Sequence, residues 1–426
     1  MLDIKYIREN PEVVKKGVID KQLSKTIDID KLLELDAKYL DLLRKVEIHR
    51  SLRNKLSEDI SKVEGAEREK LIKEATGVKT ELADMETHLK DLKTKIDEML
   101  LWVPNPPAED VPVGENDEGN VVVRKEGIPA EFSFTPKEHL DLGTELGIID
   151  TERGAKVAGF RGYYLKGDGA MLEQALLKYA IDFMVEKGFE LMSVPAMVKP
   201  EFFTGTGYFP WGDEDHYKTQ DDMALIGTAE VPLTAYYAGE VLNEDDLPIK
   251  FVGRSPGFRR EIGSYGKDTK GVFRVHQIDK VEQVVLLPAD EKLSIAWHEK
   301  MLGNAEELLK SLGIAYQVVL MCSGDMGAGQ RKKYDIESYF PGQNKYRETH
   351  SDSYFLDFQA RRLNIKYKAK DGTVKYVYTL NNTVAASPRL LACIIENYQQ
   401  EDGTILVPEV LQKYMNIKKI TKKVKD

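Results

Sequence analysis

The chain has 426 residues, of which 42% are hydrophobic and 31% are charged, and its formal net charge is -10. This length allows two or three domains with a large buried core, and the composition is that of an ordinary globular protein. The acidic balance argues against a dedicated nucleic-acid-binding protein, which is usually basic overall, although a large enzyme needs only a local basic track.

Cysteine usage and hydrophobic runs bear on the compartment. The two cysteines, Cys322 and Cys393, are far apart, so the sequence predicts neither a disulfide framework nor a structural zinc cluster. The segment Met1 to Tyr6 has no apolar signal-peptide core, and no run approaches the roughly 18 apolar residues of a membrane span. We therefore expect a cytoplasmic protein with no membrane partner.

Two heptad segments predict a long antiparallel coiled-coil hairpin over about residues 28–100, each arm on the order of 40 Å long. Their apolar positions are Leu35, Tyr39, Leu42, Val46, Leu56 and Ile60, then Leu71, Ala75, Val78, Leu82, Met85, Leu89, Leu92, Ile96 and Met99. The polar stretch Ser61 to Glu69 separates the segments, and His49 and Arg53 interrupt the first apolar seam. Heptads alone also fit a hairpin that only dimerises or packs within the body.

The hairpin is expected to end at Val103-Pro104-Asn105-Pro106-Pro107, because prolines cannot continue a helix. This predicts an N-terminal domain of residues 1–103 and a second domain of residues 104–426. Beyond the boundary, β-branched and aromatic runs predict strands at 190–197, 224–233, 249–258, 272–287, 316–321 and 374–380, and helical patterns lie near 172–187 and 291–312. Mostly sequential strands among helices indicate an α+β fold, an antiparallel sheet flanked by helices.

A strand hairpin near the middle of the chain carries the chemistry. Phe258 to Glu261 ends one apolar run, Gly263 to Gly271 follows as a loop, and Phe273 to Gln277 opens a second run. Guanidinium groups along such a hairpin suit a bent triphosphate, although a glycine-rich loop between strands is more often only a turn. The segment is not a P-loop, because Val272 stands where that motif needs Lys followed by Ser or Thr.

The segment Phe251 to Gln283 resembles motif 2 of the class II aminoacyl-tRNA synthetases, in the form found in seryl-tRNA synthetases. Four further regions resemble the same family: Gly227 to Glu230, Tyr334 to Arg362, the motif 3 segments Thr379 to Thr383, Ser387 to Arg389 and Glu396 to Gln399, and a weaker motif 1 at Gly188 to Pro195. The opening Met1 to Pro11 is also similar, so the resemblance extends from Met1 to Gln399.

The resemblance implies roles for individual residues. Catalysis falls to Arg259 and Arg389; L-serine binding to Thr228, Ala229, Glu230, Arg259, Glu282, Asn381 and Thr383; and ATP binding to Arg259, Arg260, Glu261, Arg274, Val275, Ile278, Glu348, Thr349, His350, Ser351 and Arg389. Glu348 and Ser351 would hold Mg²⁺ on the ATP phosphates, since this hard ion prefers oxygen ligands.

The sequence departs from the family pattern at several places, among them Asn382 and Pro388 in motif 3, where many bacterial relatives have glycine. Ile278 stands where many members have Phe against adenine, so stacking there would become an aliphatic contact. The family pattern Glu-Ile-Ser-Ser reads Glu348-Thr349-His350-Ser351 here, so His350 replaces the first serine. Without nearby Cys or a second His we expect no zinc. Thr383 stands where many relatives have Ser, so it keeps the hydroxyl and adds a methyl group that narrows the pocket.

The resemblance implies a seryl-tRNA synthetase, which joins L-serine to serine tRNA with ATP and Mg²⁺ and forms a homodimer through motif 1. Selenocysteine tRNA is left open as a second substrate. The alternative is a catalytically inactive, synthetase-like tRNA-binding protein, but such relatives typically lack the arginines that this chain keeps at Arg259 and Arg389. A relative that charges a carrier protein would lack the helical hairpin, which in seryl-tRNA synthetases carries the long arm of serine tRNA.

Overall fold

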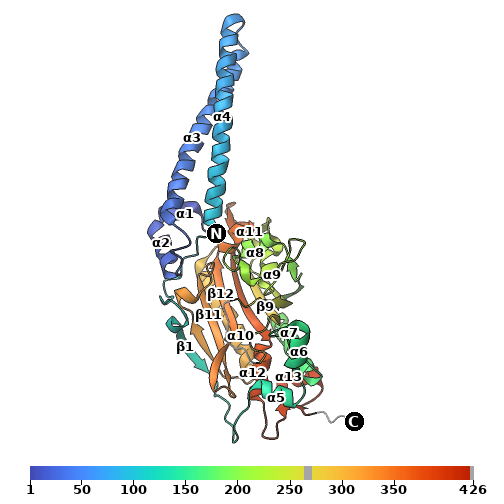
Figure 1. Ribbon diagram of the computed structural model, residues 1–426. Helices are drawn as coiled ribbons and strands as arrows, with labels where there is room; N and C mark the ends of the chain where they lie inside the picture. Colours follow the sequence, from blue (N-terminus) through green and yellow to red (C-terminus); the bar gives the residue numbers. More distant parts are fainter. Residues whose placement is uncertain (263–270, 423–426) are drawn as a thin grey trace. The chain divides into compact units, whose positions relative to one another are not determined.

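The computed structural model describes residues 1–262 and 271–422 (Figure 1). The chain divides into two compact units, one spanning Leu2–Pro104 and the other containing Met1 and the chain from Asn105 onward. The loop expected at 263–270 lies outside the described residues.

The first unit is helical and its long hairpin is confirmed (Figure 1). Its helices are α1 (Ile4–Glu9), α2 (Pro11–Asp20), α3 (Ile29–Ile60) and α4 (Gly65–Leu100). The Asp28 side chain caps α3 by accepting from the Lys31 amide at 3.1 Å, which satisfies a backbone donor that has no partner within the helix. The second helix of the hairpin, α4, begins at Gly65, which lies within the polar stretch that the sequence assigned to the turn.

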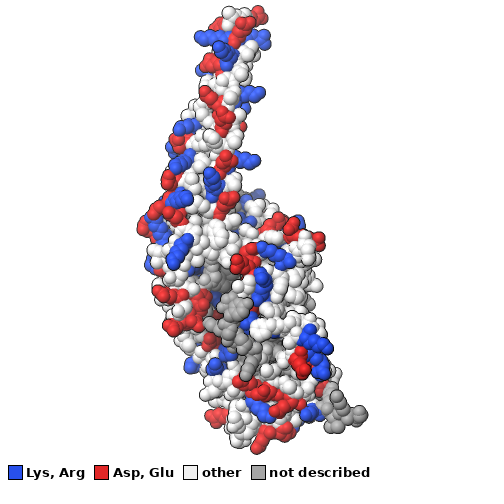
Figure 2. All heavy atoms as spheres, viewed as in Figure 1, with Lys and Arg blue, Asp and Glu red and all other residues white. Residues whose placement is uncertain are grey.

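The apolar seam of the hairpin is buried where the heptads place it. Val46 and Leu56 of α3 and Val78, Leu82 and Ile96 of α4 are all buried. Midway, the seam becomes polar as expected, because His49 lies 3.4 Å from Glu81 and Arg50 pairs with Glu86 at 2.7 Å. Figure 2 shows Lys and Arg interspersed with Asp and Glu on the visible face of the hairpin, so no single-sign stripe runs along that face.

The second unit is built on an eight-stranded sheet in the order β1-β10-β11-β12-β15-β9-β8-β4. These strands are β1 (Val121–Glu126), β10 (Tyr316–Leu320), β11 (Lys332–Phe340), β12 (Lys345–Leu356), β15 (Tyr378–Ser387), β9 (Gln277–Leu287), β8 (Ile249–Phe258) and β4 (Glu190–Ser193). Every neighbouring pair is antiparallel except β4 with β8. The predicted α+β fold with an antiparallel sheet is therefore confirmed.

Helices and small sheets surround this sheet. The helices are α5 (His139–Glu145), α6 (Thr151–Ala158), α7 (Asp168–Glu186), α8 (Pro200–Thr206), α9 (Glu230–Thr234), α10 (Glu291–Ser311), α11 (Phe358–Leu363), α12 (Arg389–Asn397) and α13 (Glu409–Met415). The short strands are β2 (Ile149–Asp150), β3 (Tyr164–Leu165), β5 (Met197–Val198), β6 (Ala224–Leu225), β7 (Val241–Asn243), β13 (Lys366–Lys368), β14 (Val374–Tyr376), β16 (Ile405–Leu406) and β17 (Lys419–Ile420).

Strand β9 shows why the central run is almost continuously hydrophobic. Val285 packs in a large core with α7, α10 and α12, whereas Val284 and Leu286 pack in a second core with Phe251. Successive side chains of a strand point to opposite faces, so both faces of the sheet are covered here. Polar side chains in such a strand need a specific reason to be there.

Three predicted strands are shorter than expected. The run 190–197 forms only β4 in the central sheet, which ends at Ser193. The run 224–233 forms only β6 before the chain turns at Gly227 and enters α9, because Ala229 and Leu233 pack into the second core as a helical face. The run 272–287 pairs only from Gln277 onward, because Val272 and Phe273 are buried in the large core instead of lying in the ladder. None of the helices in the described part of the chain has the length and apolar character needed to cross a membrane.

Candidate active site

A cavity of about 530 Å³ lies over the central strands of the second unit. It is lined by most of the residues that the sequence assigned to substrate binding: Glu230, Arg259, Glu261, Arg274, Val275, Ile278, Glu348, Thr349, His350, Ser351, Asn381, Thr383 and Arg389. The remaining candidates Thr228, Ala229, Arg260 and Glu282 are not in the lining. The structure thus brings together residues that are up to 159 positions apart, from Glu230 to Arg389.

The ends of β8 and β9 hold the first arginine. The backbone amide of Arg259 donates to the His276 carbonyl at 3.0 Å, which continues the strand pairing past Phe258. Its guanidinium lies 3.4 Å from the Gly227 carbonyl and otherwise faces the cavity. Arg260 points elsewhere: it is exposed and donates to the Glu214 carbonyl at 2.9 Å.

Glu261 has a left-handed backbone with φ of 55°, which is uncommon for a residue with a side chain. This conformation lets its carboxylate accept from Arg274 at 2.5 Å across the hairpin. The pair fixes the Arg274 guanidinium at the cavity wall, where a polyanion would meet it.

Arg389 and Glu348 form a second charged pair at the cavity. The Arg389 Nη1 donates to a Glu348 carboxylate oxygen at 3.0 Å, and its Nε donates to the Phe273 carbonyl at 3.2 Å. Burial acts to raise the pKa of Glu348, but the charges of Arg389 and Lys333 outweigh it and hold the pKa at about 2. Glu348 is therefore a carboxylate at neutral pH.

A buried carboxylate lies at another part of the cavity. Glu230 accepts hydrogen bonds from Tyr208 at 2.7 Å, from Gln359 at 2.9 Å and from Asn381 at 2.7 Å. Burial raises the pKa of Glu230 to about 7, although these donors work in the opposite direction. The group therefore changes its charge near neutral pH and would gain from a cationic ligand.

Lys280 lines the cavity and contacts two candidate residues that do not, Thr228 and Glu282. Its ammonium lies 2.5 Å from Glu282 and donates to the Thr228 hydroxyl at 3.2 Å. Burial raises the pKa of Glu282, against the effect of Lys280. Glu282 also accepts from Asn381 at 3.2 Å and lies opposite Thr383 in the β9 to β15 register. Glu282 therefore contacts Lys280 and Asn381 and pairs with Thr383 in the sheet, and all three of these residues line the cavity.

Sequence reasoning gave no role to Lys280 and Tyr208, both of which line the cavity. A signal existed for Lys280, because residues two apart on a strand share a face, and Ile278 and Glu282 flank it at that spacing. Tyr208 lies between α8 and β6, and the sequence offered no spacing that would place it at Glu230.

His350 has both ring nitrogens engaged within the protein. Its Nε2 donates to the Val384 carbonyl at 3.1 Å and its Nδ1 lies 2.9 Å from the Thr349 hydroxyl. Burial lowers the pKa of His350 to about 4, so the imidazole is neutral. Among the described residues no cluster of three or more His, Cys, Asp or Glu could hold a metal ion on its own.

The family models match in two stretches. The model described as the tRNA synthetase class II core domain (G, H, P, S and T) matches residues 214–398, which include every residue of the cavity lining except Tyr208 and Gly212. The model described as the seryl-tRNA synthetase N-terminal domain matches residues 1–107. The antiparallel sheet with arginines at a strand hairpin, together with the first match, defines a class II aminoacyl-tRNA synthetase.

Similarity over the whole length specifies the family. The chain is 43% identical to the serine–tRNA ligase of Deinococcus radiodurans over 97% of each chain, and 44% identical to that of Thermodesulfovibrio yellowstonii over 98% of this chain and 99% of the relative. It also matches the crystal structure of seryl-tRNA synthetase from Pyrococcus horikoshii complexed with ATP, with a TM-score of 0.94, 41% identity and full coverage of both chains. The chain belongs to the seryl-tRNA synthetase family.

Proposed function

We propose that this protein is a serine–tRNA ligase: it activates L-serine with ATP to seryl-adenylate and then transfers the seryl group to the 3′ end of serine tRNA. The observation that carries this function is a single cavity lined both by a buried, partly ionised carboxylate, Glu230, and by the arginines Arg259 and Arg389. An amino acid with its ammonium group at Glu230 and a nucleoside polyphosphate at the arginines would fit this cavity together. The catalytically inactive alternative has no support in these residues or in the relatives.

The serine end would be built around Glu230. Its carboxylate would bind the substrate ammonium, and Arg259 would bind the substrate carboxylate. Thr383, beside Glu282 in the sheet, would hydrogen-bond the serine hydroxyl, and Asn381 would hold the carboxylates of Glu230 and Glu282 in place. A site built to bond that hydroxyl rejects alanine, because its buried polar groups would be left without a partner. Thr228 and Ala229, which directly precede Glu230, would contribute to the serine site indirectly, since Thr228 accepts a hydrogen bond from Lys280 at the cavity wall.

The ATP end would be built from three arginines and β12. Arg259, Arg274 and Arg389 would neutralise the phosphates, Ile278 and Val275 would contact the adenine side, and Glu261 would orient Arg274. Glu348 and Ser351 both line the cavity, and their oxygens suit Mg²⁺, which commonly binds to one or two carboxylates together with substrate phosphates and water. When bound, the ion would add positive charge at the phosphates; Thr349 and His350 would support this strand. Arg260 has the weakest case for an ATP contact, because it lies outside the lining.

Adenylate formation needs no nucleophile from the protein. The serine carboxylate would attack the α-phosphate in line, and pyrophosphate would leave. The chain would supply positioning, with Arg259 placed to bridge two anions that repel each other, and charge neutralisation by Arg389. Positioning and charge neutralisation both act before and during the attack.

Three further parts of the proposal concern the tRNA, the oligomeric state and the cellular compartment. The helical hairpin, within the segment 1–107 that matches the family's N-terminal domain, would bind serine tRNA; selenocysteine tRNA is not distinguished from it. A homodimer through motif 1 is supported by apolar side chains of α7 and β4 that stay exposed in the single chain, Val185 at 45% and Leu191 at 51%. We also propose that the protein acts in the cytoplasm, where its proposed substrate tRNA would be charged.

The test of the proposed function is ATP–pyrophosphate exchange across the amino acids. Serine should support strong exchange, and alanine and threonine much weaker exchange. Charging of serine tRNA should follow in the same preparation. No exchange with any amino acid, or equal exchange with alanine, would contradict the proposal.

The pH dependence of serine binding should report the charge on Glu230. Its pKa of about 7 means that the carboxylate becomes protonated as pH falls through neutrality, and the attraction for the substrate ammonium is then lost. At saturating ATP, the KM for serine should rise about tenfold between about pH 8 and about pH 6. In Glu230→Gln the KM should be high and flat over this range. An unchanged slope in Glu230→Gln would show that another group causes the effect.

A further inference from the structure

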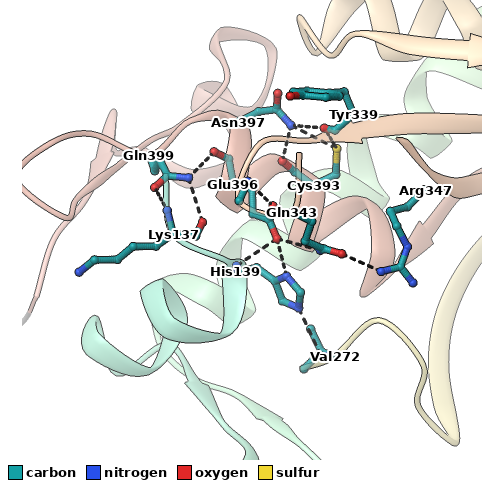
Figure 3. Close-up of polar contacts among 11 residues, drawn as sticks. Lys137, His139, Val272, Tyr339, Gln343, Arg347, Cys393, Glu396, Asn397 and Gln399 are labelled. Atoms are coloured by element: carbon teal, nitrogen blue, oxygen red, sulfur yellow. Dashed lines mark hydrogen bonds and ion pairs between the residues drawn. The ribbon is translucent and has the colours of Figure 1, made fainter. Parts of the chain in front are cut away.

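A polar cluster lies at the end of α12 (Figure 3), and its residues are not part of the cavity lining. We define this Glu396 cluster as His139, Gln343, Arg347 and Glu396. Glu396 has 0% and His139 2% of its surface exposed. The Glu396 carboxylate accepts from the His139 ring Nδ1 at 2.7 Å, from the His139 backbone amide at 3.1 Å and from the Gly342 amide at 3.0 Å.

The first branch of the cluster reaches the segment that follows the motif 2 loop. The Val272 amide donates to His139 Nε2 at 3.4 Å (Figure 3), so this nitrogen must carry a lone pair. The proton of the neutral ring is then on Nδ1, where it donates to Glu396. The imidazole also lies close to Gly271, where an added Cβ would come within 2.7 Å of Nε2. Glu396 thus selects the tautomer that can accept from Val272.

The second branch of the cluster reaches Phe273, the residue that follows Val272. Gln343 donates to Glu396 at 3.3 Å and accepts from Arg347 at 2.7 Å, and the Arg347 guanidinium lies 3.8 Å from the centre of the Phe273 ring. The Arg389 guanidinium lies 4.6 Å from the same ring and donates to the Phe273 carbonyl at 3.2 Å. Phe273 therefore contacts two guanidinium groups, one of which we assign to catalysis.

We propose that the Glu396 cluster is a positioning device for ATP: His139 anchors Val272, and Gln343 with Arg347 anchors Phe273, so that Arg274 and Arg389 are set at the spacing that the phosphates require. This inference rests on the proposed function. His139 and Glu396 are positioning residues, because they act through Val272 and Phe273 and do not line the cavity.

Two substitutions of His139 separate the anchor from mere packing. In His139→Gln the amide oxygen can reach the position of Nε2 and accept from Val272. In His139→Asn the shorter amide can only take the place of Nδ1 and donate to Glu396, so the Val272 contact is lost. Glu396 keeps the bond from the backbone amide of residue 139 in both variants. Loss of the anchor should raise the KM for ATP about three- to tenfold in His139→Asn, and His139→Gln should stay within about twofold of the wild type. The KM for serine should stay within about twofold in both.

The second branch and a matched control use half-buried positions. Gln343→Ala should also raise the KM for ATP at least about twofold, because Arg347 loses its hydrogen bond to Gln343 and with it the link to Glu396. Asn397→Ala is the control: Asn397 lies on the same helix end, but its amide donates to the Tyr339 and Cys393 carbonyls, away from Val272. It should lower the melting temperature without changing the KM for ATP.

Equal KM values for ATP in His139→Asn and His139→Gln would overturn the anchor, whether both rise or neither does. If neither His139 variant folds, Gln343→Ala decides: a wild-type KM for ATP overturns the proposal, and a raised one supports it. A wild-type enzyme without serine-dependent exchange would instead refute the proposed function, so the two failures are distinguishable.

Discussion

Replacing Arg259 by alanine should lower kcat/KM for serine-dependent pyrophosphate exchange about 100- to 1,000-fold, the loss expected when one preorganised donor to a developing charge is removed. The guanidinium is placed to meet two anions at once, the substrate carboxylate and the α-phosphate. Among the described residues, it hydrogen-bonds only to the Gly227 carbonyl, at 3.4 Å. Little folded stability should depend on it. The melting temperature should therefore stay within a few degrees of the wild type while the exchange rate collapses.

Arg260→Ala is the matched control, because it removes the same group one residue further along. Arg260 is exposed and lies outside the cavity lining, so its loss should change exchange by less than about fivefold. Arg259→Lys should recover only a small part of the activity, since an ammonium cannot replace the planar fork. Equal losses in Arg259→Ala and Arg260→Ala would mean that general positive charge, not the placed guanidinium, drives the reaction.

Part of the framework of the second unit was predictable from residue patterns, but β1, β11 and β12 of the central sheet were not among the predicted strands. Strand β8 begins and ends where its run of apolar residues does, at Ile249 and Phe258, and β9 ends at the predicted Leu287. Such runs are informative because strands buried on both faces leave little room for polar residues. The start of β9 could not be read in this way, since Val272 and Phe273 are as apolar as strand residues but are buried outside the ladder.

The hydrogen-bond partners within the site were not predictable from spacing. Glu230 meets Tyr208 only because α8 and α9 pack together, and Glu396 meets His139 across 257 positions of sequence. A family resemblance identifies residues that contact the substrate, because their chemistry constrains them one by one. It says less about a positioning contact such as that between His139 and Val272, in which one partner is a backbone amide that any residue can supply.

Shortening the helical hairpin should separate the two steps of the reaction. Removing residues 46–86 and closing the gap with a short Gly-Ser turn leaves the proximal parts of α3 and α4, with Leu32 and Ile96 among their buried residues. No residue of the cavity lining comes from the first unit. Serine-dependent exchange should therefore stay within about twofold, whereas kcat/KM for charging serine tRNA should fall on the order of a hundredfold or more, because several contacts to tRNA phosphates are lost together.

The salt dependence of charging provides the control for this variant. In the intact protein, contacts to phosphates release counterions, so charging should weaken steeply as salt rises. On the face of the hairpin that Figure 2 shows, basic and acidic side chains are mixed, so a contact to tRNA there would depend on lysines and arginines at particular positions among acidic neighbours. The shortened protein should have a shallower slope of log(kcat/KM) against log[salt]. If it keeps wild-type charging with the same slope, the hairpin does not bind tRNA; if it loses exchange while still folded, the hairpin supports the cavity instead.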